Sequence, residues 1–230
     1  IKSVQSTMQI TKAMELVASS KMRRAKERAL SVRPYFNAMY ETVARLASVT
    51  RDSDSVYTRR REVKNSLYIV IAGDRGLAGG YNSNVFKLAA AEMEGRNASV
   101  ITIGKKAQEH YAKRQWPVAA DYPGVAETMR ISDTHEIVGS LVEAFCSGRA
   151  DEVFLYYTEF VSPLQQEAKC IQLLPVSFER KENADKGGAH VLTEYDPSPE
   201  AVFNAVIPEY LYGVLYGAVV ESYCSEQSAR

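Results

Sequence analysis

The sequence predicts an α/β protein in which a long antiparallel coiled coil is joined to a compact domain with a mixed, mostly parallel sheet. Three observations lead to this fold class. Residues 1–50 keep an unbroken heptad pattern, the middle of the chain alternates short apolar strands with helices, and residues 208–230 return to helical spacing. Alternating strands and helices are typical of a Rossmann-like parallel sheet with crossover helices.

The heptad pattern of residues 1–50 predicts one helix that pairs with a second helix. Its positions alternate spacings of three and four: Ile1, Val4, Met8, Thr11, Glu15, Ala18, Met22, Ala25, Ala29, Val32, Phe36, Met39, Val43 and Leu46. At about 1.5 Å per residue, such a helix measures roughly 70 Å, which exceeds the diameter of a domain of this size. We therefore expect it to project from the compact domain, and Pro34 to bend it without ending it.

The middle of the chain predicts the compact domain. We expect strands at residues 66–72, at 99–103, around Val118, at 152–161 and at 167–174, the last two forming a hairpin. We expect helices at residues 85–94 and 105–114 and a third that ends at Cys146. Asn82 or Ser83 should cap the first of these helices, and Ser132 or Thr134 the third. Residues 51–64 read as a polar linker, and residues 181–190 as a solvated loop.

Two further helices are expected near the end, a short one at residues 200–207 and a final one that Pro208 begins. The final helix has its own seam at Leu211, Leu215, Ala218, Ser222, Ser225 and Ala229. We expect this seam to face the first helix, with small side chains allowing a close approach. No glycine or proline ends the pattern, so we expect more helix to follow. The predicted domains are residues 1–64 (helix and linker), 65–197 (α/β body) and 198–230 (a truncated C-terminal coiled-coil helix).

The charge distribution predicts an acidic partner for the first helix. The whole chain balances 28 Lys and Arg against 28 Asp and Glu, but residues 1–64 hold 14 basic and 6 acidic side chains. The basic run at residues 21–28, KMRRAKER, is also compatible with nucleic-acid binding. The heptads run straight through it, however, and no aromatic side chains interleave for base stacking. We favour contact with acidic protein loops, and keep a basic coiled-coil nucleic-acid-binding protein and a merely solvated face as alternatives.

A glycine-rich loop follows the first predicted strand. It contains Gly73, Asp74, Arg75, Gly76, Gly79 and Gly80. A strand, a glycine-rich turn and a helix N-terminus together can cradle an anion. The spacing is not the GxGxxG of dinucleotide sites, and no Gly-Lys-Ser/Thr follows. We favour a structural turn in which Asp74 and Arg75 make local or interface contacts, and keep a nucleotide-binding α/β enzyme as the alternative.

No pattern in the sequence predicts a catalytic, cofactor or metal site. Cys146, Cys170 and Cys224 are odd in number and widely spaced, which favours reduced thiols over a disulfide or zinc framework. No spacing unites the histidines with carboxylates, and no G-x-S-x-G motif is present. No apolar run approaches 18 residues, and no signal or transit peptide is visible.

Three stretches carry a family resemblance. They are ITKAMELVASSKMRRAKE near the start, GDRGLAGGYNSNVFK in the middle and VVESYCSEQSAR at the end. In this order and at about this spacing, they resemble the gamma subunits of the F1 part of F-type ATP synthases. The resemblance covers essentially the whole chain. The first and last stretches are specific, whereas the glycine loop alone is a weak signal.

The resemblance implies a rotor shaft without an active site of its own. In that family the terminal helices turn inside the hexamer of alpha and beta subunits, and so couple transmembrane proton flow to ATP synthesis or hydrolysis on beta. The α/β body holds the epsilon subunit and stands on the membrane c-ring. No nucleic acid, cofactor or direct small-molecule substrate is implied. The expected location is a peripheral membrane complex on the cytoplasmic face of a bacterial plasma membrane.

Matching the family position by position implies contacts with the alpha and beta subunits. The matched residues are Lys21, Met22, Arg23 and Arg24, which face the acidic loop of beta, and Glu226, Gln227 and Arg230 on the closing helix. The family's last helix continues beyond SEQSAR, so we expect the tip of the shaft to be absent. The chloroplast insertion with a regulatory cysteine pair has no counterpart in residues 176–206, so thiol regulation is not expected.

Overall fold

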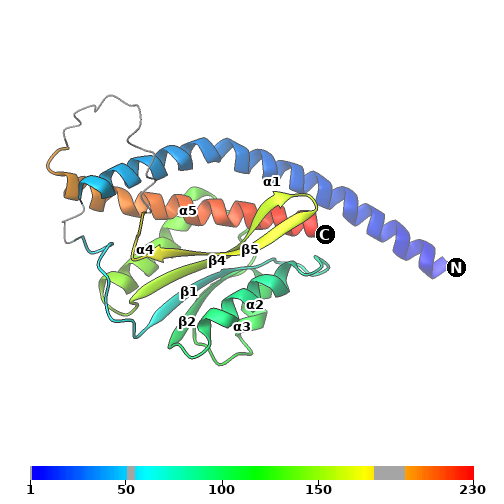
Figure 1. Cartoon of the computed structure of the whole chain (residues 1–230). Coiled ribbons are helices and arrows are strands. Elements are labelled where there is room, and N and C mark those ends of the chain that lie inside the picture. The colour runs from blue at the N-terminus through cyan, green and yellow to red at the C-terminus, as the bar shows by residue number, and fades with distance from the viewer. Residues whose placement is uncertain (1, 51–54, 179–194) are drawn as a thin grey trace.

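The computed structural model describes residues 2–50, 55–178 and 195–230 (Figure 1). Its elements in chain order are α1 (Lys2–Val49), β1 (Ser66–Ile71), α2 (Tyr81–Met93), β2 (Ala98–Ile103), α3 (Lys105–Tyr111), β3 (Val118–Tyr122), the 3-10 helix η1 (Ile131–Asp133), α4 (Thr134–Cys146), β4 (Glu152–Ser162), β5 (Gln165–Leu174) and α5 (Pro199–Ala229). The expected order of strands and helices is confirmed in the compact part of the chain.

The five strands form one mixed sheet in the order β3-β2-β1-β4-β5. β1 pairs in parallel with β2 and β4, β2 pairs in parallel with β3, and only β5 runs antiparallel, to β4. The central strand β1 is buried along its whole length, which is why its sequence is a continuous apolar run rather than an alternating one. The predicted mixed, mostly parallel sheet is therefore confirmed.

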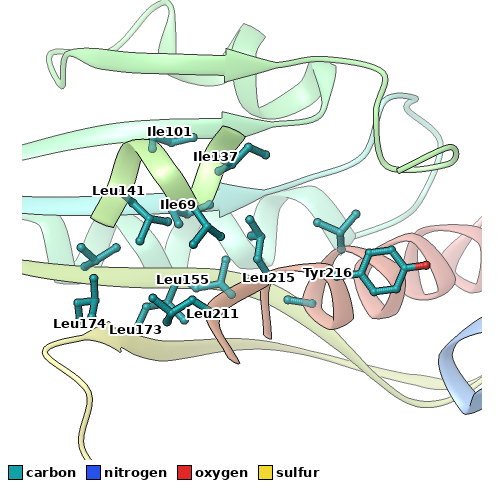
Figure 2. Packing of buried hydrophobic residues seen from close by; sticks show 14 of the residues in the cluster. Ile69, Ile101, Ile137, Leu141, Leu155, Leu173, Leu174, Leu211, Leu215 and Tyr216 are labelled. Carbon is teal, nitrogen blue, oxygen red and sulfur yellow. The ribbon is translucent and has the colours of Figure 1, made fainter. Parts of the chain in front are cut away.

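Each face of the sheet has its own apolar core. Tyr68 and Val70 of β1 point toward α2 and α3, where they meet Val85 and Met93. The opposite face packs against α4 and α5. Figure 2 shows its core, in which the side chains of Leu211 and Leu215 from α5 lie with those of the strands and of α4: Ile69, Ile101, Ile137, Leu141, Leu155, Leu173 and Leu174.

The helix α1 lies along α5 and runs in the opposite direction (Figure 1). It continues through Pro34, as expected. The predicted seam holds from Ala18 to Leu46, both of which are buried. Before Ala18 the helix extends past the end of α5, and its apolar side chains there are open to solvent, with Val4 72% and Met8 64% exposed. The antiparallel pairing of the terminal helices is thus confirmed.

The break predicted at Pro208 is wrong, because α5 is one helix with Pro208 inside it. The helix begins after Ser198, whose Oγ accepts a hydrogen bond from Ala201 N at 3.1 Å. A proline inside a helix removes one backbone donor at a cost of about 3 kcal/mol. An unbroken helix buries Phe203 and Ile207 before the proline and Leu211 after it, and burying each of these side chains stabilises the fold by roughly 1.5–3 kcal/mol.

The seam predicted on α5 faces the sheet instead of α1. Ser222 Oγ accepts from Thr158 N at 3.1 Å, and Ser225 Oγ donates to Thr158 O at 3.2 Å, so both serines are bonded to β4. The residues of α5 that contact α1 form a second seam: Tyr210, Gly213, Tyr216, Gly217, Glu221 and Cys224. By length and composition alone, α5 is long and apolar enough to cross a membrane. A helix that is buried on two sides by other parts of the protein has the same composition.

Several predicted helix ends and caps are also wrong. α2 begins at Tyr81, and no side chain caps it; Asn82 Oδ1 accepts from Gly73 N instead. Neither Ser132 nor Thr134 caps α4, because η1 leads directly into that helix. α3 stops at Tyr111 rather than at residue 114. These ends depend on tertiary contacts that a local pattern does not contain.

The linker predicted at residues 51–64 packs on the body around residues 55–58, whereas residues 62–64 are exposed. Ser55 and Tyr57 are buried, and Tyr57 O accepts from Val176 N at 2.7 Å. Within residues 55–64 the structure has no helix or strand. The loop predicted at residues 181–190 lies outside the described residues.

Substituting Gly213 tests how closely α1 and α5 approach. A Cβ at this position would lie 2.7 Å from Phe36 Cε1, so Gly213→Ala should lower the free energy of unfolding by about 1–3 kcal/mol through overpacking. Gly217→Ala is the matched control, since its Cβ would lie 3.4 Å from the same ring. Urea denaturation measures both. Equal effects of the two substitutions would contradict the close approach at Gly213.

Candidate functional site

The predicted site residues gather where α1 passes the glycine loop and the end of α5. A hollow of about 530 Å³ lies there, which we call the junction hollow. Its lining comes from all three segments: Ile10, Ala13, Met14, Val17, Ala18, Lys21, Arg75, Gly76, Leu77, Gln227 and Arg230. Residues that the sequence assigned to a loop and to two separate helices therefore surround one place.

The glycine loop is held by hydrogen bonds to its own domain. Gly73 N donates to Asn82 Oδ1, and Gly73 O accepts from Lys106 N, both at 2.9 Å. Asp74 Oδ1 accepts from Lys105 N at 2.9 Å and from Gly124 N at 2.7 Å. The carboxylate of Asp74 thus bonds the first backbone donor of α3 and holds the glycine loop against the start of that helix.

A second carboxylate occupies the space beside β1. A Cβ on Gly73 would lie 2.7 Å from Glu226 Cδ, so the backbone of the loop and the side chain of α5 are in direct contact. Open α/β sheets bind ligands at this edge, where the connections after β1 and β4 diverge. A carboxylate against the turn after β1, where a phosphate would lie, opposes nucleotide binding. The geometry therefore favours the structural turn that we expected from the spacing.

The outer part of the glycine loop faces solvent. Leu77 is 80% exposed and has a positive φ of 60°, a conformation that is uncommon for a leucine. A Cβ on Gly76 or Gly79 would meet nothing within 4 Å. Gly73 and Asp74 fix the loop to the sheet domain, and Leu77 projects from the loop into solvent.

The basic run of α1 divides between two directions. Lys21 Nζ lies 2.6 Å from Glu127 of the loop before η1, and Arg28 Nε donates to Tyr216 Oη at 2.6 Å. The hydrogen bond from Lys21 lowers the pKa of the Glu127 carboxyl. Arg23 and Arg24, between them, are exposed. Lys26 is exposed as well, so Arg23, Arg24 and Lys26 are the cations of the run that face solvent.

The predicted contact residues on α5 are engaged within the chain. Glu226 is 2% and Gln227 4% exposed. Arg230 Nη2 lies 2.6 Å from Glu226 Oε1, and Arg230 Nη1 donates to Gln227 Oε1 at 3.2 Å. Met22 is half-buried, and its carbonyl oxygen accepts from the buried thiol of Cys224 at 3.8 Å. These residues therefore make contacts within the chain at the place where α1, α5 and the glycine loop meet.

Sequence reasoning missed Glu127, Tyr216 and Leu77 as parts of this site. Glu127 is 106 positions away from its partner Lys21, and no local pattern marks it. Tyr216 lies on the face of α5 that the predicted seam left out. Leu77 is an apolar residue between two glycines of a loop, and this placement was the one signal in the sequence that could have marked it as part of the site.

A second hollow, of about 520 Å³, lies between α2 and α3. It is lined by Asn82, Phe86, Lys106, Glu109, His110, Lys113 and Arg114. The His110 ring stacks on Phe86 at 4.1 Å, and burial together with the charge of Arg114 lowers the pKa of the imidazole. Lys106 is paired with Glu109 at 2.6 Å. This lining contains no hydroxyl or thiol nucleophile.

The cysteines are three free thiols. Burial raises the pKa of the Cys224 thiol to about 11, which keeps it protonated and unreactive at neutral pH. Among the described residues, no group of His, Cys, Asp and Glu side chains is placed to hold a metal ion.

The fold and the site define a class of protein: a two-helix stalk fastened to an α/β sheet domain through a rigid glycine loop. Comparison with known proteins identifies this class. A model of the ATP synthase family matches residues 1–230. An ATP synthase gamma chain from Ruminococcus albus is 48% identical over the whole of this chain and 80% of its own length. The sodium ion specific ATP synthase gamma chain of Acetobacterium woodii is 39% identical, over 82% of its length.

A solved structure has the same fold. The chain aligns with one from the central stalk and c-ring of the Tetrahymena thermophila mitochondrial ATP synthase, with a TM-score of 0.70, 22% identity and coverage of 96% of this chain and 95% of that one. This chain belongs to the ATP synthase gamma chain family.

The contact between Lys21 and Glu127 makes a pH-dependent prediction. Replacing Lys21 with Met should raise the pKa of Glu127 toward its usual value of about 4.3, which a carboxyl NMR titration measures. Because the folded pKa is the lower one, the stability that the pair contributes is present above the usual carboxyl pKa and fades as the pH falls through the lowered one. Lys26→Met is the control, since Lys26 is exposed and has no carboxylate partner in the described part of the chain. An unchanged Glu127 titration would contradict the pairing.

Proposed function

We propose that this chain is the central rotor shaft of an F-type ATP synthase, coupling ion flow through the membrane to ATP synthesis or hydrolysis by turning inside a ring of alpha and beta subunits. The observation that carries the proposal is the 48% identity with a gamma chain across the entire sequence. The chain itself is a non-catalytic subunit in this proposal, and the reaction takes place on beta.

The paired helices supply the physical basis for a shaft. At about 1.5 Å per residue, the 48 residues of α1 measure roughly 72 Å, well beyond the body of the protein. Its free portion carries solvent-exposed Val4, Met8, Ile10, Leu16 and Val17. Apolar side chains in such number on an unpartnered helix are a surface for other proteins. The inside of a subunit ring is a setting that would cover them from all sides.

The domains and partners are assigned as follows. Residues 1–64 supply the first shaft helix and its linker, residues 198–230 supply the second shaft helix, and residues 65–197 form the body. Arg23 and Arg24 meet an acidic loop of beta, together with the exposed side of Lys21 and Met22. Glu226, Gln227 and Arg230 support that contact from beneath. The body holds epsilon and rests on the c-ring, at the cytoplasmic face of a bacterial plasma membrane.

Neither alternative function has comparable support. A nucleotide site in the glycine loop would compete with the carboxylate of Glu226, which lies against Gly73 and accepts from Arg75 N. A nucleic-acid-binding helix would need the whole basic run, but Lys21 and Arg28 are bound within the chain. Each alternative remains measurable, as a thermal shift with ATP or as salt-steep DNA binding.

Assembly with partner subunits tests the proposed function. The chain is co-expressed with the alpha and beta subunits of the Ruminococcus albus enzyme, and the product is analysed by size and by ATPase activity. We expect one copy of this chain in each alpha and beta ring, with activity above that of alpha and beta alone. Failure of the chain to enter the ring would contradict the proposal.

Reversing two charges tests the assigned contact with beta. Arg23→Glu combined with Arg24→Glu should weaken association with the ring several-fold, since an exposed charge pair contributes roughly 0.2–1 kcal/mol and the variant replaces attraction with repulsion. The loss should shrink as ionic strength rises. Arg45→Glu, an exposed position near the other end of α1, is the control. The assignment would be wrong if both variants associated with equal strength.

A further inference from the structure

The carboxylate of Glu226 joins the end of α5 to the body. Its side chain is 2% exposed, and Oε1 lies 2.6 Å from Arg230 Nη2. The same oxygen accepts from Arg75 N in the glycine loop at 3.4 Å. A buried carboxylate persists only where a cation and hydrogen-bond donors compensate for its lost hydration. Here one partner comes from α5 itself and the other from the backbone of the body.

Gly73 completes this contact. Any side chain there would overlap Glu226, since a Cβ would lie 2.7 Å from Cδ and 2.8 Å from Oε1. Through its N–H and C=O, Gly73 is bonded to Asn82 of α2 and to Lys106 of α3. The carboxylate therefore touches a part of the backbone that two helices of the body hold in place.

The contact of Glu226 lies at the place where a twist of the helix pair would first act on the body. Deeper in the body, α5 is attached to β4 by Ser222 and Ser225. Glu226 and Arg230 lie at the end of α5, beside the junction hollow and beneath the free portion of α1. A twist applied to that free portion reaches the body first at this level.

We propose that Glu226 is a positioning residue, which clamps the helix pair to Gly73 of the body so that the two turn as one. This inference rests on the proposed function and adds a mechanical joint to it. The contact is direct, because the Glu226 carboxyl lies against the Gly73 backbone while Arg230 and the Arg75 N–H fix its Oε1. Without the clamp, this end of α5 would be held by its core packing and by Ser228, whose Oγ donates to Pro163 O at 2.8 Å, and we expect the helix pair to twist further against the body before the rotation reaches the membrane side.

A double-mutant cycle on the isolated chain tests the contact without reference to function. Gly73→Ala should lower Tm on the order of 5 °C when Glu226 is present. In the background of Glu226→Ala the same substitution should cost much less, because its obstacle is gone. Gly76→Ala is the control, since a Cβ there meets nothing within 4 Å. Additive losses of Tm would overturn the clamp.

Ion pumping by the assembled complex tests the mechanical role. In inverted membrane vesicles, Glu226→Gln should lower the number of ions pumped per ATP hydrolysed several-fold, whereas a merely structural loss would lower assembly and leave that ratio unchanged. Glu209→Gln, an exposed position on α5, is the control. A normal ratio in assembled Glu226→Gln complexes would overturn the joint. If the proposed function itself fails, the unaltered chain will not assemble, and this result is distinct from the other two.

Discussion

The burial of α5 on two sides is the constraint on which the rest of the structure depends. One side of this helix closes the core against β1, β4 and α4, and the other side supports α1. The two apolar layers thus share one helix. Because α5 must fit both, it carries glycines where Phe36 of α1 approaches and hydroxyls where Thr158 of β4 offers its backbone. A stalk attached in this way cannot detach from the sheet without opening the core.

The end of α5 also explains why the sheet does not offer a nucleotide site. The strand order β3-β2-β1-β4 is that of a nucleotide-binding fold, and a glycine-rich turn follows β1, although its spacing is not GxGxxG. The end of α5 brings Glu226 against Gly73, and Asp74 bonds the start of α3. The place after β1 that would stabilise phosphate charge is thus taken by the Glu226 carboxylate of the chain itself. Gly73 is needed for this packing, since a Cβ there would lie 2.7 Å from Glu226 Cδ, and so a turn that resembles an anion site instead holds two parts of the chain together.

Much of this architecture could be predicted from the sequence, because it rests on local periodicity. The heptads of α1, the apolar run of β1 and the hairpin of β4 and β5 each have one straightforward interpretation. α5 does not, since a helix that is apolar all round contains more than one seam, and the spacing alone chose the face that packs on β4. The helix break predicted at Pro208 was wrong for a related reason. The sequence shows that a proline destabilises a helix, but it does not show that α5 is buried on both sides of Pro208. The pairing of Lys21 with Glu127 joins distant parts of the chain and leaves no local pattern.

The charges of the junction follow a division that only the fold reveals. In the basic run of α1, Lys21 and Arg28 lie two turns apart and bind this chain, and the cations between them remain exposed. The inward set fixes α1 to the loop before η1 and to α5, and the outward set remains free for an acidic surface. The contacts of Lys21 and Arg28 hold this part of α1 in place, so Arg23 and Arg24 project from a backbone that is fixed to the rest of the chain. The basic run therefore combines anchoring contacts within the chain with a cationic face that is open to solvent.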